Sequence, residues 1–105
     1  MEQEMISFKI IAYAGEARSY AFNALQSAKK GDFKEAENLI NKSKDSMKLA
    51  HQVQTDILFK EIEGEKTEMS VLLVHAQDHL MTALLAIDLI EEMIELYRNK
   101  ERSTS

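Results

Sequence analysis

The chain has 105 residues, with 13 Lys and Arg against 18 Asp and Glu, so its net charge is −5 at neutral pH. This acidic balance argues against nucleic acid and anionic membrane surfaces as partners, and the lack of cysteine excludes disulfides, thiolate metal sites and cysteine nucleophiles. No stretch approaches the roughly 18 apolar residues of a membrane span, and the acidic start lacks the basic region of a signal peptide. We therefore expect one cytoplasmic domain over residues 1–105, without membrane insertion.

The first predicted helix covers residues 4–30. Proline is absent, only three glycines occur, and straight-chain helix formers dominate the composition. Gly15 interrupts the apolar pattern, which indicates either tight packing or a slight bend, or else room left for a ligand or partner. The apolar line of this helix consists of Ile6, Ile10, Tyr13, Ala17, Tyr20 or Ala21, Ala24 and Ala28.

The first break follows Lys29 and Lys30. Gly31 suits the left-handed position after a helix, and Asp32 is a good N-cap with Glu35 at the capping-box spacing. Because the loop is short, the first two helices should be antiparallel neighbours.

The second predicted helix covers residues 33–61, and Gln54 occupies an apolar position in its seam. A buried amide is costly without hydrogen-bond partners, so Gln54 should reach either a neighbouring backbone or the polar cluster on the third helix. His51 lies near the same face. The seam consists of Ala36, Ile40, Ser43, Met47, Ala50, Gln54 and Ile57.

The second break lies at residues 63–66, with Thr67 as a plausible cap. The third helix should cover residues 68–100, followed by a polar tail over 101–105 that is expected to fray. Three long helices joined by tight turns predict an all-α, antiparallel up-down-up three-helix bundle.

Two apolar seams run along the third helix. The first seam, spaced alternately by four and three residues, is Met69, Leu73, Ala76, Leu80, Ala83, Ile87, Ile90, Ile94 and Tyr97. The second seam is Val71, Val74, Asp78, Met81 and Leu85. Since a helix turns about 100° per residue, the second seam points away from the first. One chain needs one buried face, so the second seam predicts a partner subunit.

Polar residues cluster at the second seam. With Leu80 in the first seam as zero, Asp78 lies at about 160°, His75 at about 220° and His79 at about 260° around the helix. His75 therefore lies at the margin of the predicted subunit contact, where a groove could stay open to solvent, and Asp78 lies deeper in that contact.

Three chemical interpretations of this cluster are open from the residues alone. The i, i+4 spacing of His75 and His79 beside Asp78 suits a metal site, although no glutamate stands between the histidines as in a hydrolase helix. A neutral imidazole can instead attack a phosphoryl group and hold it. The third interpretation is structural, with histidines that are satisfied at an interface.

The run Val74–Thr82, VHAQDHLMT, resembles the signature of the lactose/cellobiose-specific IIA component of the bacterial sugar phosphotransferase system. The likeness extends along nearly the whole chain in family-like order and spacing. Its other parts are Gly15-Glu16-Ala17-Arg18, Gly31-Asp32-Phe33 with Ala36, and Ala50-His51 with Gln54-Thr55.

The resemblance implies a homotrimer that acts as a phosphocarrier. The histidine at position 75 would accept a phosphoryl group from HPr and pass it to a cysteine of the IIB component. IIB would then deliver it to a disaccharide (lactose, cellobiose or chitobiose) that crosses the membrane through the IIC permease. The resemblance also implies that three copies of Asp78 meet at the trimer axis and bind one structural divalent cation, which we expect to be Mg²⁺.

Further roles follow as hypotheses. His79 is expected to donate to phosphoryl oxygens, Gln54 to hydrogen-bond in the same groove, and Leu72 and Met81 to contact HPr and IIB. The rival function is a non-enzymatic, metal-binding or structural helical trimer.

Overall fold

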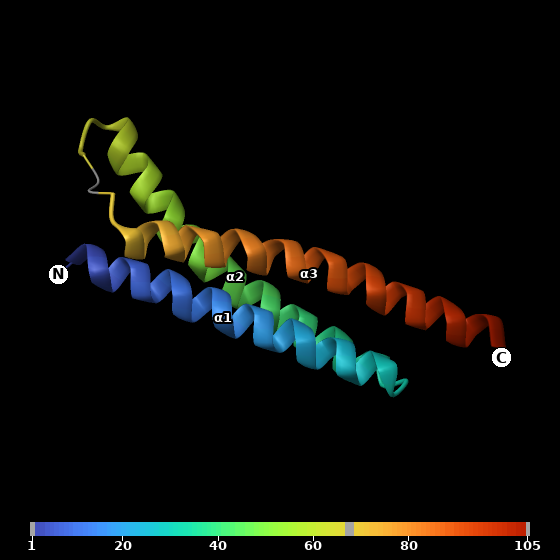
Figure 1. Cartoon of the computed structure of the whole chain (residues 1–105). Coiled ribbons are helices and arrows are strands. Elements are labelled where there is room, and N and C mark those ends of the chain that lie inside the picture. Colours follow the sequence, from blue (N-terminus) through green and yellow to red (C-terminus); the bar gives the residue numbers. More distant parts are fainter. Residues whose placement is uncertain (1, 67–68, 105) are drawn as a thin grey trace.

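The structure, a computed structural model, describes residues 2–66 and 69–104 and contains three long helices. Helix α1 covers Glu2–Lys29, α2 covers Phe33–Ile62 and α3 covers Val71–Thr104. Figure 1 shows that α1 and α3 run in the same direction and α2 in the opposite one. The predicted all-α, up-down-up bundle is confirmed. None of the described helices is long and apolar enough to cross a membrane.

The turn between α1 and α2 forms as its residues predict. Gly31 has a φ of +85°, which glycine adopts without a steric cost. The Asp32 side chain accepts a hydrogen bond of 3.1 Å from the backbone N–H of Glu35. This bond satisfies one of the backbone donors left open at the start of α2.

The start of α3 differs from the expected one. The expected cap Thr67 and first residue Glu68 lie outside the described residues, but Met69 and Ser70 are described and are not helical. The Ser70 hydroxyl accepts a 3.0 Å hydrogen bond from the backbone N–H of Leu73, so Ser70 is the cap. Because Met69 precedes the helix, it leaves the first seam and is 72% exposed. A serine directly before an apolar run is a sequence signal for this start.

The end of α3 also lies beyond its predicted position, because the helix continues from residue 100 to Thr104. The expected fraying of this tail stays a prediction, and Ser105 lies outside the described residues. The last turns have neighbours in the α1–α2 turn. The Arg98 guanidinium lies over the Phe33 ring, 5.5 Å from its centre, and the Glu101 carboxylate lies beside Gly31. These contacts support helix that would otherwise stand free in solvent.

The core lies along α1, which packs against both other helices. Its buried residues are mostly alanines, and small side chains let helices approach closely. The Ser43 hydroxyl of α2 donates a 2.5 Å hydrogen bond to the carbonyl of Ala17 in α1. The core consists of Ile10, Ala14, Ala17, Ala21, Ala24, Ala28, Ala36, Ile40, Met47, Ala50, Ile57, Leu73, Ala76, Leu80, Ala83, Ile87, Ile90 and Ile94.

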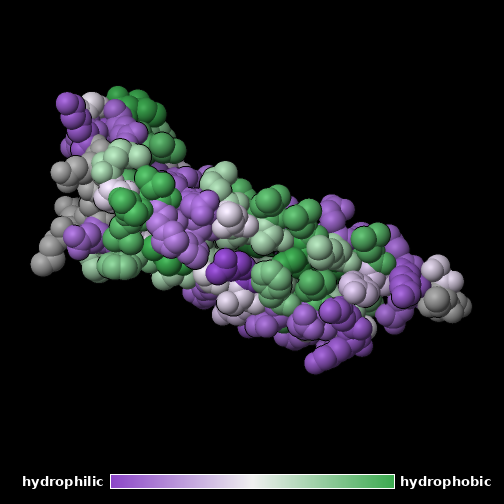
Figure 2. All heavy atoms as spheres, in the orientation of Figure 1, coloured by the Kyte–Doolittle hydropathy of each residue, from purple (hydrophilic) through white to green (hydrophobic). Residues whose placement is uncertain are grey.

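The last turns of α2 leave the bundle and project beyond α3 (Figure 1). They expose Leu58, Phe59 and Ile62, and Figure 2 shows apolar atoms at this projecting end. Within one chain this part of α2 therefore has a large apolar surface in contact with solvent.

Gly15 does not reflect tight packing inside the chain. A Cβ atom added there would have no neighbour within 4 Å. The two other interpretations, a slight bend of the helix and room for a ligand or partner outside this chain, stay as predictions.

Candidate functional site

His75 and His79 lie one turn apart on α3 and contact each other. Their ring centres are 4.6 Å apart and their planes meet at 87°, so the edge of one ring faces the other ring. His75 is exposed and His79 is half-buried. The i, i+4 spacing on a helix produces this contact, and it leaves the His75 ring open to a reaction partner.

A metal site within a single chain finds no support in this geometry. The described residues contain no group of three or more His, Cys, Asp or Glu side chains placed to hold an ion. Two perpendicular rings in edge contact also differ from two nitrogens that converge on one point. A site that holds a metal through several protein ligands including Asp78 would need ligands from further copies of the chain.

The second seam lies on the solvent side of α3, as its spacing predicts. Val71 is 88% exposed, Met81 56% and Leu85 59%, and Val74 and Asp78 are also exposed. Apolar atoms gather along the middle of α3 in Figure 2. The chain thus presents a continuous apolar surface with one carboxylate at its centre.

Gln54 finds its partner on α3, where one of the two expectations placed it. Its side-chain amide donates to the side-chain oxygen of Gln77. Gln77 lies about 160° from His75 around the axis of α3, because two residues of helix turn about 200°. Within one chain, Gln54 and His75 therefore lie on opposite sides of α3. No sequence pattern gave Gln77 a role, although it lies inside the VHAQDHLMT run.

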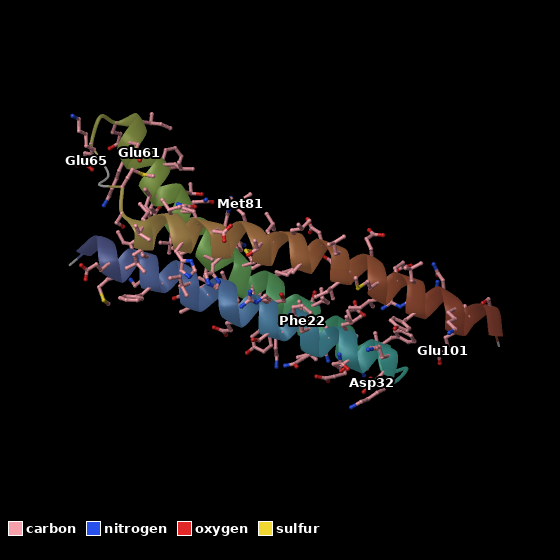
Figure 3. The ribbon with its side chains drawn as sticks, in the orientation of Figure 1. Phe22, Asp32, Glu61, Glu65, Met81 and Glu101 are labelled. Carbon is pink, nitrogen blue, oxygen red and sulfur yellow. The ribbon has the colours of Figure 1, made fainter. Side chains whose placement is uncertain are left out.

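A groove of about 450 Å³ lies between α2 and α3 on the Gln54 side, and we call it the α2–α3 groove. Its lining does not include His75 or His79. The side chain of Met81, one of the expected docking residues, lines this groove and projects from α3 (Figure 3), whereas Leu72 is half-buried elsewhere. The groove is lined by Lys44, Met47, Lys48, His51, Gln54, Leu80, Met81, Leu84, Ile87, Asp88 and Glu91.

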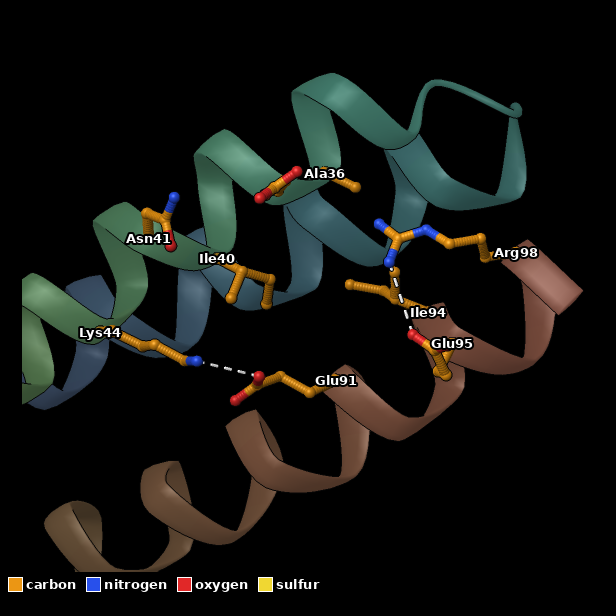
Figure 4. A pocket seen from close by; sticks show the side chains of 9 residues that line it. Ala36, Ile40, Asn41, Lys44, Glu91, Ile94, Glu95 and Arg98 are labelled. Atoms are coloured by element: carbon orange, nitrogen blue, oxygen red, sulfur yellow. Dashed lines mark hydrogen bonds and ion pairs between the residues drawn. The ribbon is translucent and has the colours of Figure 1, made fainter.

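A smaller pocket of about 210 Å³ follows toward the end of α3. The ion pair of Lys44 with Glu91, at 3.0 Å, joins α2 to α3 across this pocket, and the pair of Arg98 with Glu95, at 3.4 Å, lies within α3 at its edge (Figure 4). The amine of Lys44 is thus occupied, whereas Lys48 and the ring of His51 have no hydrogen bond or ion pair in the part of the chain that the structure describes.

Known proteins similar to this chain share both its sequence and its fold. The lactose-specific EIIA component of the phosphotransferase system of Streptococcus mutans is 45% identical over 97 residues, which are 92% of this chain and 93% of that protein. A crystal structure of the cellobiose-specific enzyme IIA from Bacillus anthracis superimposes with a TM-score of 0.94 at 46% identity, covering 97% of this chain and 94% of that one.

A solution structure of the IIA(chitobiose)–HPr complex of Escherichia coli gives a TM-score of 0.81 at 43% identity, covering 96% of this chain and 98% of that one. The family model of the lactose/cellobiose-specific IIA subunit of the phosphotransferase system matches residues 5–98. This chain therefore belongs to the lactose/cellobiose-specific IIA family of the sugar phosphotransferase system.

Proposed function

We propose that His75 is the phosphoryl acceptor of a sugar phosphotransferase carrier that takes the group from HPr and passes it to a IIB component. The supporting observation is an exposed imidazole in the VHAQDHLMT run of a chain of this family. Exposure matters because donor and acceptor proteins must each reach the same ring.

Transfer needs an unprotonated ring nitrogen on His75. Its lone pair attacks phosphorus, the bond from phosphorus to the donor atom of HPr breaks, and the electron pair leaves with the donor. In the second step a cysteine thiolate of IIB attacks phosphorus, and the phosphorus–nitrogen bond breaks. Such transfers depend mainly on positioning and on neutralising the charge of the phosphoryl oxygens.

His79 is suited to assist this chemistry. Its ring contacts that of His75 at 4.6 Å, so it restricts the orientation of the acceptor. A ring N–H of His79 would donate to a phosphoryl oxygen, and hydrogen bonds to charged groups contribute about 1.5–3 kcal/mol each.

We further propose a homotrimer in which the second seams of three chains meet. The exposed apolar residues at alternating three- and four-residue spacing support this arrangement. Three Asp78 carboxylates would then lie together in an apolar surface and would require a cation or protons. Carboxylate oxygens suit Mg²⁺, so this ion would hold the subunits together. It would have no part in phosphoryl transfer, which is the role of His75.

HPr is the proposed donor because a relative forms a complex with it. HPr and IIB must reach His75 in turn, so their contact surfaces overlap, and both complexes must be weak enough to dissociate quickly. Of the expected contacts, Met81 offers the more exposed surface and Leu72 the less exposed one. The relatives are named for lactose, cellobiose and chitobiose, and we propose a disaccharide of this group for a cytoplasmic carrier.

Labelled phosphoenolpyruvate with enzyme I and HPr tests the proposal. Label that is stable in base, labile in acid and lost in His75→Ala is expected, since it identifies phosphohistidine at this position. His51→Ala serves as the matched histidine control and should still accept label. Label retained by His75→Ala would refute the assignment. An unlabelled trimer that assembles only with metal would favour the non-enzymatic alternative.

A further inference from the structure

We propose that Ser70 is a positioning residue for phosphoryl acceptance, because its hydroxyl holds the helical turn against which the His75 ring lies. The inference rests on the proposed carrier function of His75. It assigns an effect on the transfer rate to a side chain that precedes the acceptor by five residues and acts only through the backbone of α3.

Ser70 connects the start of α3 to the core. Its hydroxyl accepts a 3.0 Å hydrogen bond from the backbone N–H of Leu73, whose side chain is only 3% exposed. Its carbonyl accepts a 3.0 Å bond from the backbone N–H of Val74, which is the first bond along the helix. One residue thus supplies both the cap and the first helical hydrogen bond, directly before His75.

Little else within the chain holds this first turn. Residues 71–74 are Val-Leu-Leu-Val, and valine is a weaker helix former than alanine or leucine. Val71 is 88% exposed and Val74 52%, so packing contributes little at either position. Because helix ends are stable only when packing or capping supports them, the Ser70 hydroxyl has a large share in keeping the turn helical.

The sequence offers no later cap before the acceptor. Residues 71–77 contain no serine, threonine, aspartate or asparagine, which are the residue types that cap helices best. The next such residue is Asp78, and a helix that began there would leave His75 outside it. Without the Ser70 hydroxyl, fraying of α3 therefore has no stopping point before His75.

The His75 ring depends on this turn for its direction. Side chains on a helix lean toward its N-terminus and lie over the preceding turn, which for His75 is the turn of Val71 and Leu72. The edge contact with His79, at 4.6 Å between ring centres, also requires both residues in helical register. Since a misplacement of about 1 Å can slow a reaction roughly a hundredfold, fraying here should slow the attack on phosphorus.

A matched pair of substitutions at one position tests the inference. Ser70→Thr keeps a hydroxyl, whereas Ser70→Val gives nearly the same shape without one, so both variants present a similar surface to phospho-HPr. Rapid-quench measurements should show label transfer to Ser70→Val slowed roughly three- to tenfold, because loss of a cap shifts a helix–coil equilibrium by about two- to thirtyfold. The slowing should persist at saturating phospho-HPr, and Ser70→Thr should transfer within about twofold of wild type.

Asp32→Ala is the control, because it removes a cap far from His75. Asp32 caps α2 through the backbone N–H of Glu35, in the turn at the opposite end of α1 from the start of α3 (Figure 1). This variant should lose stability to urea about as much as Ser70→Val, yet transfer label at the wild-type rate. Equal slowing in Asp32→Ala, equal rates in Ser70→Thr and Ser70→Val, or a wild-type rate in Ser70→Val would overturn the inference.

The wild-type chain separates the two proposals. If it accepts no label on His75, the carrier function fails. If wild type and Ser70→Val both accept label on His75 at the same rate, the carrier function stands and the role of Ser70 falls.

Discussion

The first and second seams of α3 both consist mainly of apolar residues, yet their surroundings are opposite. Leu80 in the first seam is 1% exposed, whereas Leu85 in the second is 59% exposed. The buried residues of the first seam contain no ionisable side chain, and the second seam contains Asp78 with His75 at its margin.

This difference shows how one helix serves folding and function separately. The bundle closes through the first seam alone, so residues on the other side are free of the packing demands of the chain. Polar groups with chemical roles are tolerated there because water or another subunit, and not the core, surrounds them.

The largest change in the free energy of unfolding is expected for a substitution in the first seam. Leu80→Ala should lower the free energy of unfolding by about 2–5 kcal/mol, because it removes a buried side chain and leaves a cavity. Urea unfolding at several protein concentrations would measure it, and the loss should be present at each one. Leu85→Ala is the matched leucine substitution, and the loss of unfolding free energy that it causes should depend on protein concentration. Equal, concentration-independent losses would erase the distinction between the seams.

Asp78→Leu probes the polar centre of the second seam. Replacing three clustered charges by apolar packing should keep the trimer and raise its stability in chelator by about 1–4 kcal/mol. Metal content by mass spectrometry and thermal unfolding with and without EDTA would measure this. Metal retained at wild-type stoichiometry would contradict the proposed role of Asp78.

Leu85→Lys should weaken assembly roughly a hundredfold, about 2.7 kcal/mol, by placing a charge in the subunit contact. Helical content by circular dichroism should stay unchanged, because the bundle does not use this position. Sedimentation velocity would follow the loss of trimer. Leu49→Lys, at an exposed leucine on α2, is the control, and an equal response there would mean that the second seam has no special role.

The smallest effects concern two buried hydroxyls and should have opposite signs. Ser43→Ala removes a hydrogen bond to Ala17 and should cost about 1 kcal/mol. Ser7 is buried and its hydroxyl has no partner within the described residues, so Ser7→Ala should be neutral or stabilising by less than about 1 kcal/mol. Thermal unfolding of both variants measures the difference, and a larger loss for Ser7→Ala would be inconsistent with an unpaired hydroxyl.

Most of the fold follows from local patterns. The absence of proline, the Gly31-Asp32 turn and the periodicity of the seams predict three helices and a buried face on each. The candidate site was predictable only in part. The VHAQDHLMT run placed His75, Asp78 and His79 on one side of a helix, but no local pattern shows which residue of another helix lies beside them.

The sequence by itself determined that there are three helices, where each lies to within a few residues, and which direction each side chain takes around its own helix axis, because these depend on interactions within a few residues. Only the tertiary structure decided how the axes relate. It placed the last turns of α3 beside the α1–α2 turn, turned the end of α2 away from the bundle, and put Gln54 on the far side of α3 from His75. These relations depend on how three helices pack against one another, and a repeat of 3.6 residues contains no information about that packing.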